Sequence, residues 1–135
     1  MRKIMLLLVV SMLSGIMLNA QSKKGNIDVL YFKANLPCCK ARACNALEAD
    51  LQKIIQKNYT DGTVVLKQIK LDDEANKSLI DKYKAKSQTV IIVKTLKKKE
   101  FSEDISDLVS AYFFNKNLEN FEKELIVKID ELKKK

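Results

Sequence analysis

The three cysteines of this chain, Cys38, Cys39 and Cys44, fall within seven residues and read Cys-Cys-Lys-Ala-Arg-Ala-Cys. An apolar run typical of a strand, residues 29–32, precedes them, and a run typical of a helix, residues 47–55, follows. Thiols at a turn from strand to helix are typical of redox sites. The spacing is not Cys-x-x-Cys, so the cluster locates a site without establishing that it is active.

Cys38 and Cys39 are the predicted attacking thiols. The N-terminus of a helix carries unsatisfied N–H groups and a partial positive charge, and both stabilise a thiolate. Lys40 and Arg42 add positive charge beside these two cysteines. The alternative is a structural disulfide that closes the turn.

Cys44 is the predicted buried, resolving thiol. It lies three residues before Leu47 and seven before Leu51, which places it on the apolar face of the expected helix. The alternative is a core cysteine that packs as a small apolar residue and has no redox role.

The composition excludes several kinds of site. The chain has no histidine and only three glycines. A Ser-His-Asp triad, a Cys-His pair and a histidine-ligated metal are therefore excluded, as is a glycine-rich phosphate loop. We expect no cofactor.

The N-terminus has the three parts of a secretory signal peptide. Met1-Arg2-Lys3 is basic, residues 4–18 are uncharged and mostly apolar, and Asn19-Ala20 offers a cleavage point. The alternative, an uncleaved anchor, would need about 20 apolar residues. We expect a signal peptide over 1–20, one domain over 21–135, export to the periplasm or the extracellular space, and no stable membrane insertion after cleavage.

The net charge of the chain is +8. We expect no nucleic-acid partner, because export separates the chain from nucleic acid and its lysines are spread over the sequence. A weak attraction to anionic membranes is the alternative. The expected partners are protein thiols or disulfides, and the sequence does not determine the oligomeric state.

The apolar pattern predicts alternating strands and helices. Strands are expected over 26–33, 63–71 and 89–93, with the last of these in the centre of the sheet and a lysine-rich edge strand over 97–101. Helices are expected from 42 to about 57, from 72 to about 83 and over 118–132, with a helical or irregular segment over 105–114. This order predicts an α/β sandwich around a mixed sheet.

Four segments carry a resemblance to a known family. They are Tyr31-Phe32, Cys44-Asn45-Ala46-Leu47-Glu48, Lys70-Leu71-Asp72-Asp73-Glu74-Ala75-Asn76 and Tyr83-Lys84-Ala85-Lys86-Ser87-Gln88-Thr89. Over residues 28–132 the chain resembles the thioredoxin-like superfamily, and most closely the exported family of nitrophenyl-compound nitroreductase subunits. The resemblance implies a three-layer sandwich with a mixed four-stranded sheet, thiol–disulfide exchange, and participation in nitroaromatic reduction, although the sequence has no flavin-binding feature.

The chain departs from this family at two positions of the site. Ala41 stands where the first cysteine of the motif belongs, and Gln88, followed by Thr89, stands where the superfamily has a cis-proline. A non-proline cis peptide costs ~2.5–4 kcal/mol, so the peptide before Gln88 is predicted to be trans.

The pairing of the thiols depends on where the helix begins. If it began at Cys38, Cys39 and Cys44 would differ by ~500° and by ~7.5 Å of rise, too far for a disulfide, which needs Cα atoms about 4.4–6.8 Å apart. The family alignment implies a start near Arg42, which leaves Cys39 or Cys38 free to pair with Cys44. A strained Cys38–Cys39 bridge is a further alternative.

Three functions follow from these observations. The first is thiol–disulfide exchange through Cys38, Cys39 and Cys44, supported by Lys40, Arg42, Gln88 and Thr89. The second is a non-catalytic binding or accessory subunit that kept the fold. The third is a carrier that holds a soft ion such as Cu(I) or As(III) on three thiolates.

Overall fold

The computed structural model describes residues 26–35 and 39–135. Along this part of the chain the elements are β1 (Ile27–Lys33), α1 (Cys39–Asn58), β2 (Val64–Lys70), the 3-10 turn η1 (Glu74–Asn76), α2 (Lys77–Tyr83), β3 (Val90–Leu96), β4 (Lys99–Asp104), α3 (Ser106–Asn115) and α4 (Leu118–Lys134). The predicted order of strands and helices is confirmed.

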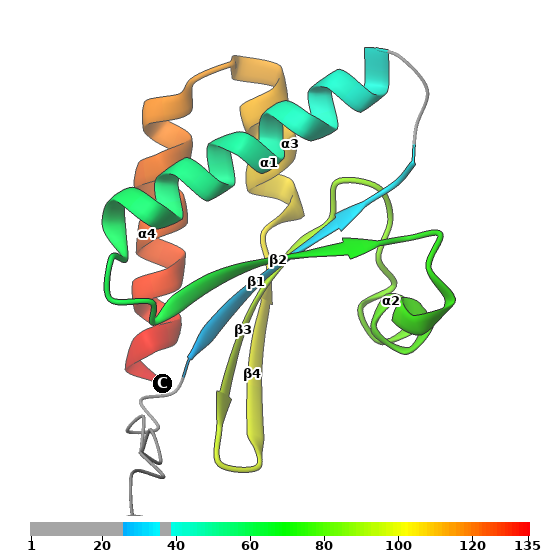
Figure 1. Ribbon diagram of the computed structural model, residues 1–135. Coiled ribbons are helices and arrows are strands. Elements are labelled where there is room, and N and C mark those ends of the chain that lie inside the picture. The colour runs from blue at the N-terminus through cyan, green and yellow to red at the C-terminus, as the bar shows by residue number, and fades with distance from the viewer. Residues whose placement is uncertain (1–25, 36–38) are drawn as a thin grey trace, which may run out of the picture.

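The four strands form one mixed sheet in the order β2-β1-β3-β4 (Figure 1). β1 is parallel to β2 and antiparallel to β3, and β3 is antiparallel to β4. The predicted central position of the β3 run is confirmed, because β3 lies between β1 and β4. The lysine-rich strand is at an edge, as expected.

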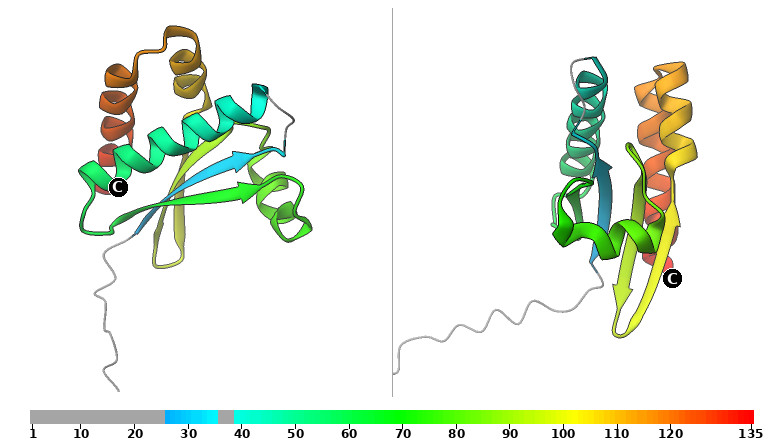
Figure 2. Two further views of the ribbon diagram at one scale, coloured as in Figure 1. Left: turned by 45° about the horizontal axis from the view of Figure 1, so that its top comes forward. Right: turned by 90° about the vertical axis from the view of Figure 1, so that its right-hand side faces the viewer.

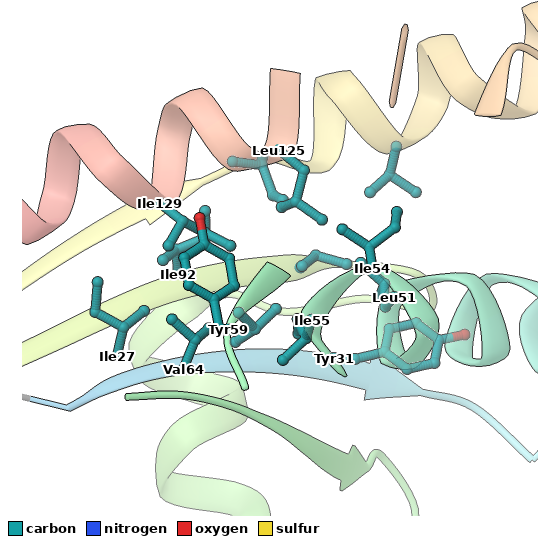
Figure 3. Close-up of a cluster of buried hydrophobic side chains, with 14 of the residues drawn as sticks. Ile27, Tyr31, Leu51, Ile54, Ile55, Tyr59, Val64, Ile92, Leu125 and Ile129 are labelled. Atoms are coloured by element: carbon teal, nitrogen blue, oxygen red, sulfur yellow. The ribbon is translucent and has the colours of Figure 1, made fainter. Parts of the chain in front are cut away.

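Two apolar layers cover the sheet. On one face, residues of α1, α3 and α4 share a core with alternate residues of β1 and β3. Figure 3 shows part of this core, with Leu51 and Ile54 of α1 and Leu125 and Ile129 of α4 directed toward the same interior. On the other face, Leu79, Ile80 and Tyr83 of α2 pack against the remaining strand residues. The result is the predicted three-layer α/β sandwich (Figure 2).

Local sequence explains the helices that frame the sheet. The apolar residues of α1 at i, i+4, i+7 and i+8, which are Leu47, Leu51, Ile54 and Ile55, are all buried. α4 begins at the cap residue Asn117, whose side chain accepts a hydrogen bond from the backbone N–H of Asn120.

Three expected boundaries were wrong. The cysteine-bearing helix begins at Cys39, three residues before Arg42. The predicted helix over 72–83 is divided into η1 and α2, because Asp73 caps the 3-10 turn rather than a longer helix. The hairpin strand begins at Lys99 because Lys97, with φ 57°, lies in the turn.

The N-terminal segment 1–20, predicted to be a signal peptide, lies outside the described residues. Over residues 26–35 and 39–135, no helix has the length and apolar character that crossing a membrane requires.

Candidate thiol site

Cys44 lies in the second turn of α1 and faces the core. Its exposed fraction is 0%, as are those of Leu47 and Leu51 on the same helix face. Its predicted burial is therefore confirmed, whereas its role as a resolving thiol stays a prediction.

The hydroxyl of Tyr31 joins β1 to the backbone of α1 beside this thiol. It donates a hydrogen bond to the carbonyl oxygen of Cys44 at 3.0 Å. Burial raises the pKa of Tyr31 well above its ordinary value, and hydrogen bonding to Cys44 raises it further. The phenol therefore stays protonated and acts as a donor at neutral pH.

The turn before β3 supplies two polar groups to the sulfur of Cys44. The side-chain amide Nε2 of Gln88 donates to Cys44 Sγ at 3.6 Å, and the hydroxyl oxygen of Ser87 lies 3.9 Å from the same sulfur. No cis peptide occurs in the described residues, so the peptide before Gln88 is trans, as predicted. Gln88 instead has φ 70°, in the left-handed region.

Backbone pairing holds this turn against β1. The N–H of Gln88 donates to the carbonyl of Phe32 at 3.0 Å, and the N–H of Phe32 donates to the carbonyl of Thr89 at 2.9 Å. The hydroxyl of Thr89 accepts from the N–H of Lys86 at 3.0 Å. Of the two supporting residues expected in this turn, Gln88 contacts Cys44 and Thr89 fixes the turn.

A polar cleft opens near Cys44, at the carboxyl ends of β1 and β2. Its volume is about 350 Å³, and its lining residues are Lys33, Ala34, Asn35, Asn45, Gln68, Lys70 and Asp72. Lys33 is paired with Glu48 of α1 at 2.6 Å, and Gln68 donates to the same carboxylate at 3.4 Å. Cys44 is not among the lining residues, so the cleft is a neighbour of the thiol and not an entrance to it.

Cys38 is outside the described residues. The backbone of Cys39, Lys40 and Arg42 forms the first turn of α1, and the side chain of Arg42 is exposed. Within a continuous helix, the Cα atoms of Cys39 and Cys44 lie about 9 Å apart, beyond the range of a disulfide. The expectation that a late helix start leaves Cys39 free to reach Cys44 was therefore wrong for this form of α1.

The early start has a local cause. No Ser, Thr, Asp or Asn stands directly before Arg42 to cap a helix there. Lys40, Ala41 and Arg42 are all good helix formers, so they continue the helix toward Pro37.

No group of three His, Cys, Asp or Glu side chains that could hold a metal ion occurs within the described part of the chain. The soft-metal alternative also requires the thiols of Cys38 and Cys39. It stays a prediction.

Sequence reasoning named Gln88 as a supporting residue but did not foresee that its side chain would contact the sulfur of Cys44. It missed three other contacts of the site: the Tyr31 hydroxyl on Cys44, the Ser87 hydroxyl at the sulfur, and the Lys33–Glu48 pair. The signal for Tyr31 was present, because a tyrosine within a buried strand usually finds a partner for its hydroxyl.

No family model matches the chain, and no curated protein matches it. Among solved structures, it is similar to a malarial protein, with 28% identity over 64% of this chain and 92% of that one and a TM-score of 0.42. It is also similar to an uncharacterised thioredoxin-like protein from Clostridium perfringens, with 15% identity over 73% of this chain and 76% of that one and a TM-score of 0.44. The sheet order β2-β1-β3-β4, with only β3 reversed and helices on both faces, is that of a thioredoxin-like fold.

Proposed function

We propose that this chain is an exported thioredoxin-like protein that performs thiol–disulfide exchange. The observation that carries the proposal is the fully buried sulfur of Cys44, held between α1 and the turn before β3. A resolving thiol can occupy such a place, because it attacks only after a mixed disulfide has formed next to it.

The exchange has two steps. The thiolate of Cys38 or Cys39 attacks one sulfur of a partner disulfide, which forms a mixed disulfide and releases the other partner sulfur as a thiolate. The thiolate of Cys44 then attacks the protein's own sulfur in that mixed disulfide, and the second partner thiolate leaves. The partner gains two electrons, and this protein becomes an intramolecular disulfide that an external dithiol must reduce.

The second step requires the start of α1 to move. Cys39 and Cys44 belong to one helix and lie too far apart for a bond, so the first turn of α1 has to unwind before Cys44 can attack Cys39. The terminal turn of a helix is the part that opens most readily. Attack of Cys44 on Cys38 likewise requires the helical residues between these two thiols to unwind.

An insulin-reduction assay on the mature protein tests the proposal. Cys38→Ser and Cys39→Ser identify the attacking thiol, because loss of that thiol abolishes turnover. Cys44→Ser leaves the mixed disulfide unresolved, so a covalent adduct with insulin should accumulate on a non-reducing gel.

Folding is checked separately. Cys44→Ala removes the thiol without burying a hydroxyl, so it is the matched control for any loss of stability in Cys44→Ser. Turnover that is unchanged in all three serine variants rules out this mechanism.

A non-catalytic accessory subunit is the second candidate. The separation of Cys39 from Cys44 along α1 favours it, as does the left-handed trans residue Gln88 in place of a cis-proline. The family resemblance suggests a reductase for nitroaromatic compounds as the larger assembly. Redox titration followed by mass spectrometry separates the two candidates: a protein that never forms a bridge to Cys44 under oxidising glutathione is accessory, and one that forms it reversibly is a catalyst.

Export is tested on the chain produced in a bacterium with a secretion system. We expect the mature protein to begin at Gln21 and to be found outside the cytoplasm. An N-terminus at Met1 in the cytoplasmic fraction contradicts this part of the proposal.

A further inference from the structure

Gln88 has a backbone conformation that is unusual for a glutamine. It has φ 70°, and among the described non-glycine residues only Lys84, Lys97 and Lys116 also have a positive φ. Lys84 and Lys116 end helices, and Lys97 lies in a hairpin turn. All three are exposed, whereas Gln88 is half-buried against the core. The left-handed region of φ and ψ is strained for a glutamine, whereas glycine or asparagine tolerates it. We therefore expect a contact of the Gln88 side chain that offsets this strain.

The backbone of the turn directs that side chain. The N–H of Gln88 donates to the carbonyl of Phe32 at 3.0 Å, and the N–H of Thr89 donates to the carbonyl of Lys86 at 3.1 Å. These two bonds fix the peptide planes on both sides of Gln88. The amide group of Gln88 is thereby brought to 3.6 Å from the sulfur of Cys44. Neither residue is near the other in sequence, so the contact exists only in the folded chain.

The sulfur has little other means of stabilising negative charge. Cys44 is fully buried, so water does not solvate it. The described polar groups that face it are Gln88 and Ser87 from the turn and Tyr31 from β1. Hydrogen bonds from N–H and O–H donors favour a thiolate over a thiol.

We propose that Gln88 is a positioning residue whose side-chain amide hydrogen-bonds the sulfur of Cys44 and stabilises its thiolate, with Ser87 as a second donor. The use of this thiolate in a reaction rests on the proposed exchange function. In the resolving step, the first turn of α1 unwinds and Cys44 then loses its proton to the solvent that this opening admits. The amide of Gln88 keeps both of its protons, and the thiolate attacks the mixed disulfide as described above. Gln88 forms no covalent bond in either step.

The test uses a protein in which Cys44 is the single cysteine, with Cys38→Ser and Cys39→Ser. The ultraviolet absorbance of the thiolate is followed against pH, and the tyrosinate contribution is subtracted with the same titration of a variant in which Cys44 is also replaced by Ala. The difference reports Cys44 alone. Gln88→Gly removes the amide and also relieves the backbone strain. We expect the midpoint of the titration to move up by about one pH unit, a tenfold loss of thiolate at a given pH, while stability to urea is kept or increased.

Two further variants make the result specific. Lys84→Gly is the matched control, because it relieves the same kind of strain in the same connection without a contact to Cys44. It should leave the midpoint in place. Gln88→Glu has nearly the same shape but replaces the donor with a carboxylate, so it should raise the midpoint further than Gln88→Gly.

The two proposals can fail separately. A midpoint in Gln88→Gly that equals that of Lys84→Gly overturns the role of Gln88, whatever the exchange activity. A raised midpoint in a chain whose wild-type form does not reduce insulin supports the role of Gln88 at the sulfur and overturns the exchange function. A raised midpoint together with slower resolution of the mixed disulfide supports both.

Discussion

At the scale of single residues, the surroundings of Cys44 combine an apolar core with two polar contacts. Its sulfur is buried among apolar neighbours, yet two polar side chains reach it from a turn more than forty positions later in the chain. Apolar side chains beside the sulfur would cost less free energy to bury than Ser87 and Gln88, because polar groups in a core must find hydrogen-bond partners. At this place the sulfur of Cys44 is the partner that the side chains of Ser87 and Gln88 find.

The Tyr31 hydroxyl should contribute measurably to stability. Tyr31→Phe removes its buried hydrogen bond to the Cys44 carbonyl, and we expect a loss of about 1 kcal/mol in the free energy of unfolding by urea. Tyr83→Phe is the control, because the Tyr83 hydroxyl bonds the exposed Glu100. Equal losses in the two variants would contradict the structural importance of the Tyr31 contact.

All four tyrosines of the chain should resist ionisation. Burial is the first cause of a raised pKa at Tyr31, Tyr59, Tyr83 and Tyr112, and at Tyr112 the pKa reaches about 12 with help from a hydrogen bond to Asp50. Since the folded chain prefers the neutral phenols, this stability is fully present below the ordinary pKa of 10.0 and is lost as the pH rises through the folded values.

Spectrophotometric titration checks this expectation. Little tyrosinate should form in the native protein near pH 10, and titration in concentrated urea should return an ordinary curve. A native chain in which half of the tyrosines ionise near pH 10 would contradict the burial of these side chains.

At the scale of elements, the first turn of α1 decides whether the thiols can meet. If a disulfide joins Cys39 to Cys44, the oxidised protein must lose helical structure at that turn, because the helix holds the two Cα atoms about 9 Å apart. We expect the amides of Arg42 and Ala43 to exchange with deuterium faster in the oxidised form than in the reduced form.

The C-terminal half of α1 serves as the internal reference for that measurement. Ile54 and Ile55 belong to the core and should keep their protection in both forms. Equal protection at Arg42 in both forms, with a bridge to Cys39 verified by mass spectrometry, would contradict the helix geometry.

The end of α4 is anchored by a buried lysine. Lys94 of β3 is 7% exposed, and its ammonium donates to the carbonyl oxygen of Lys133 in the last turn of α4 at 2.6 Å. A cation at this position also complements the partial negative charge at the helix C-terminus. Lys94→Met keeps the apolar stem and removes the charge, so we expect a loss of about 1.5–3 kcal/mol in the free energy of unfolding.

Lys128→Met is the matched comparison for Lys94→Met. Lys128 pairs with Glu103 at 2.7 Å, and its side chain is 42% exposed, against 7% for Lys94. Pairs that solvent reaches contribute at most about 1 kcal/mol. A larger loss in Lys128→Met than in Lys94→Met would show that burial does not set the strength of these contacts.

At the scale of the whole molecule, the pattern of apolar residues was enough to predict the sandwich. The β-branched run ending at Val93 marked the central strand, and the spacing of Cys44, Leu47 and Leu51 marked the inward face of α1. These predictions were confirmed because the periodicity of apolar residues can be read from a short stretch of sequence, and because burial of apolar surface is the dominant favourable term in folding.

The parts that could not be predicted depend on contacts between distant segments. The start of α1 was misplaced because Pro37 permits several helix starts and no cap residue selects one. The left-handed conformation of Gln88 and its contact with Cys44 follow from how the turn pairs with Phe32, which no local propensity encodes. The contacts of the site could therefore be known only from the folded structure, whereas the fold could be predicted without them.

The central place of β1 has a consequence for how the chain matures during synthesis. β1 is the first strand along the chain, yet its residue Ile27 pairs with Lys94 in β3. Leu132, near the end of α4, belongs to the same core. A growing chain thus cannot close its sheet until most of its length has emerged. Long-range pairing of this kind slows folding, so an unfinished chain keeps the apolar residues of β1 exposed until α4 has been made.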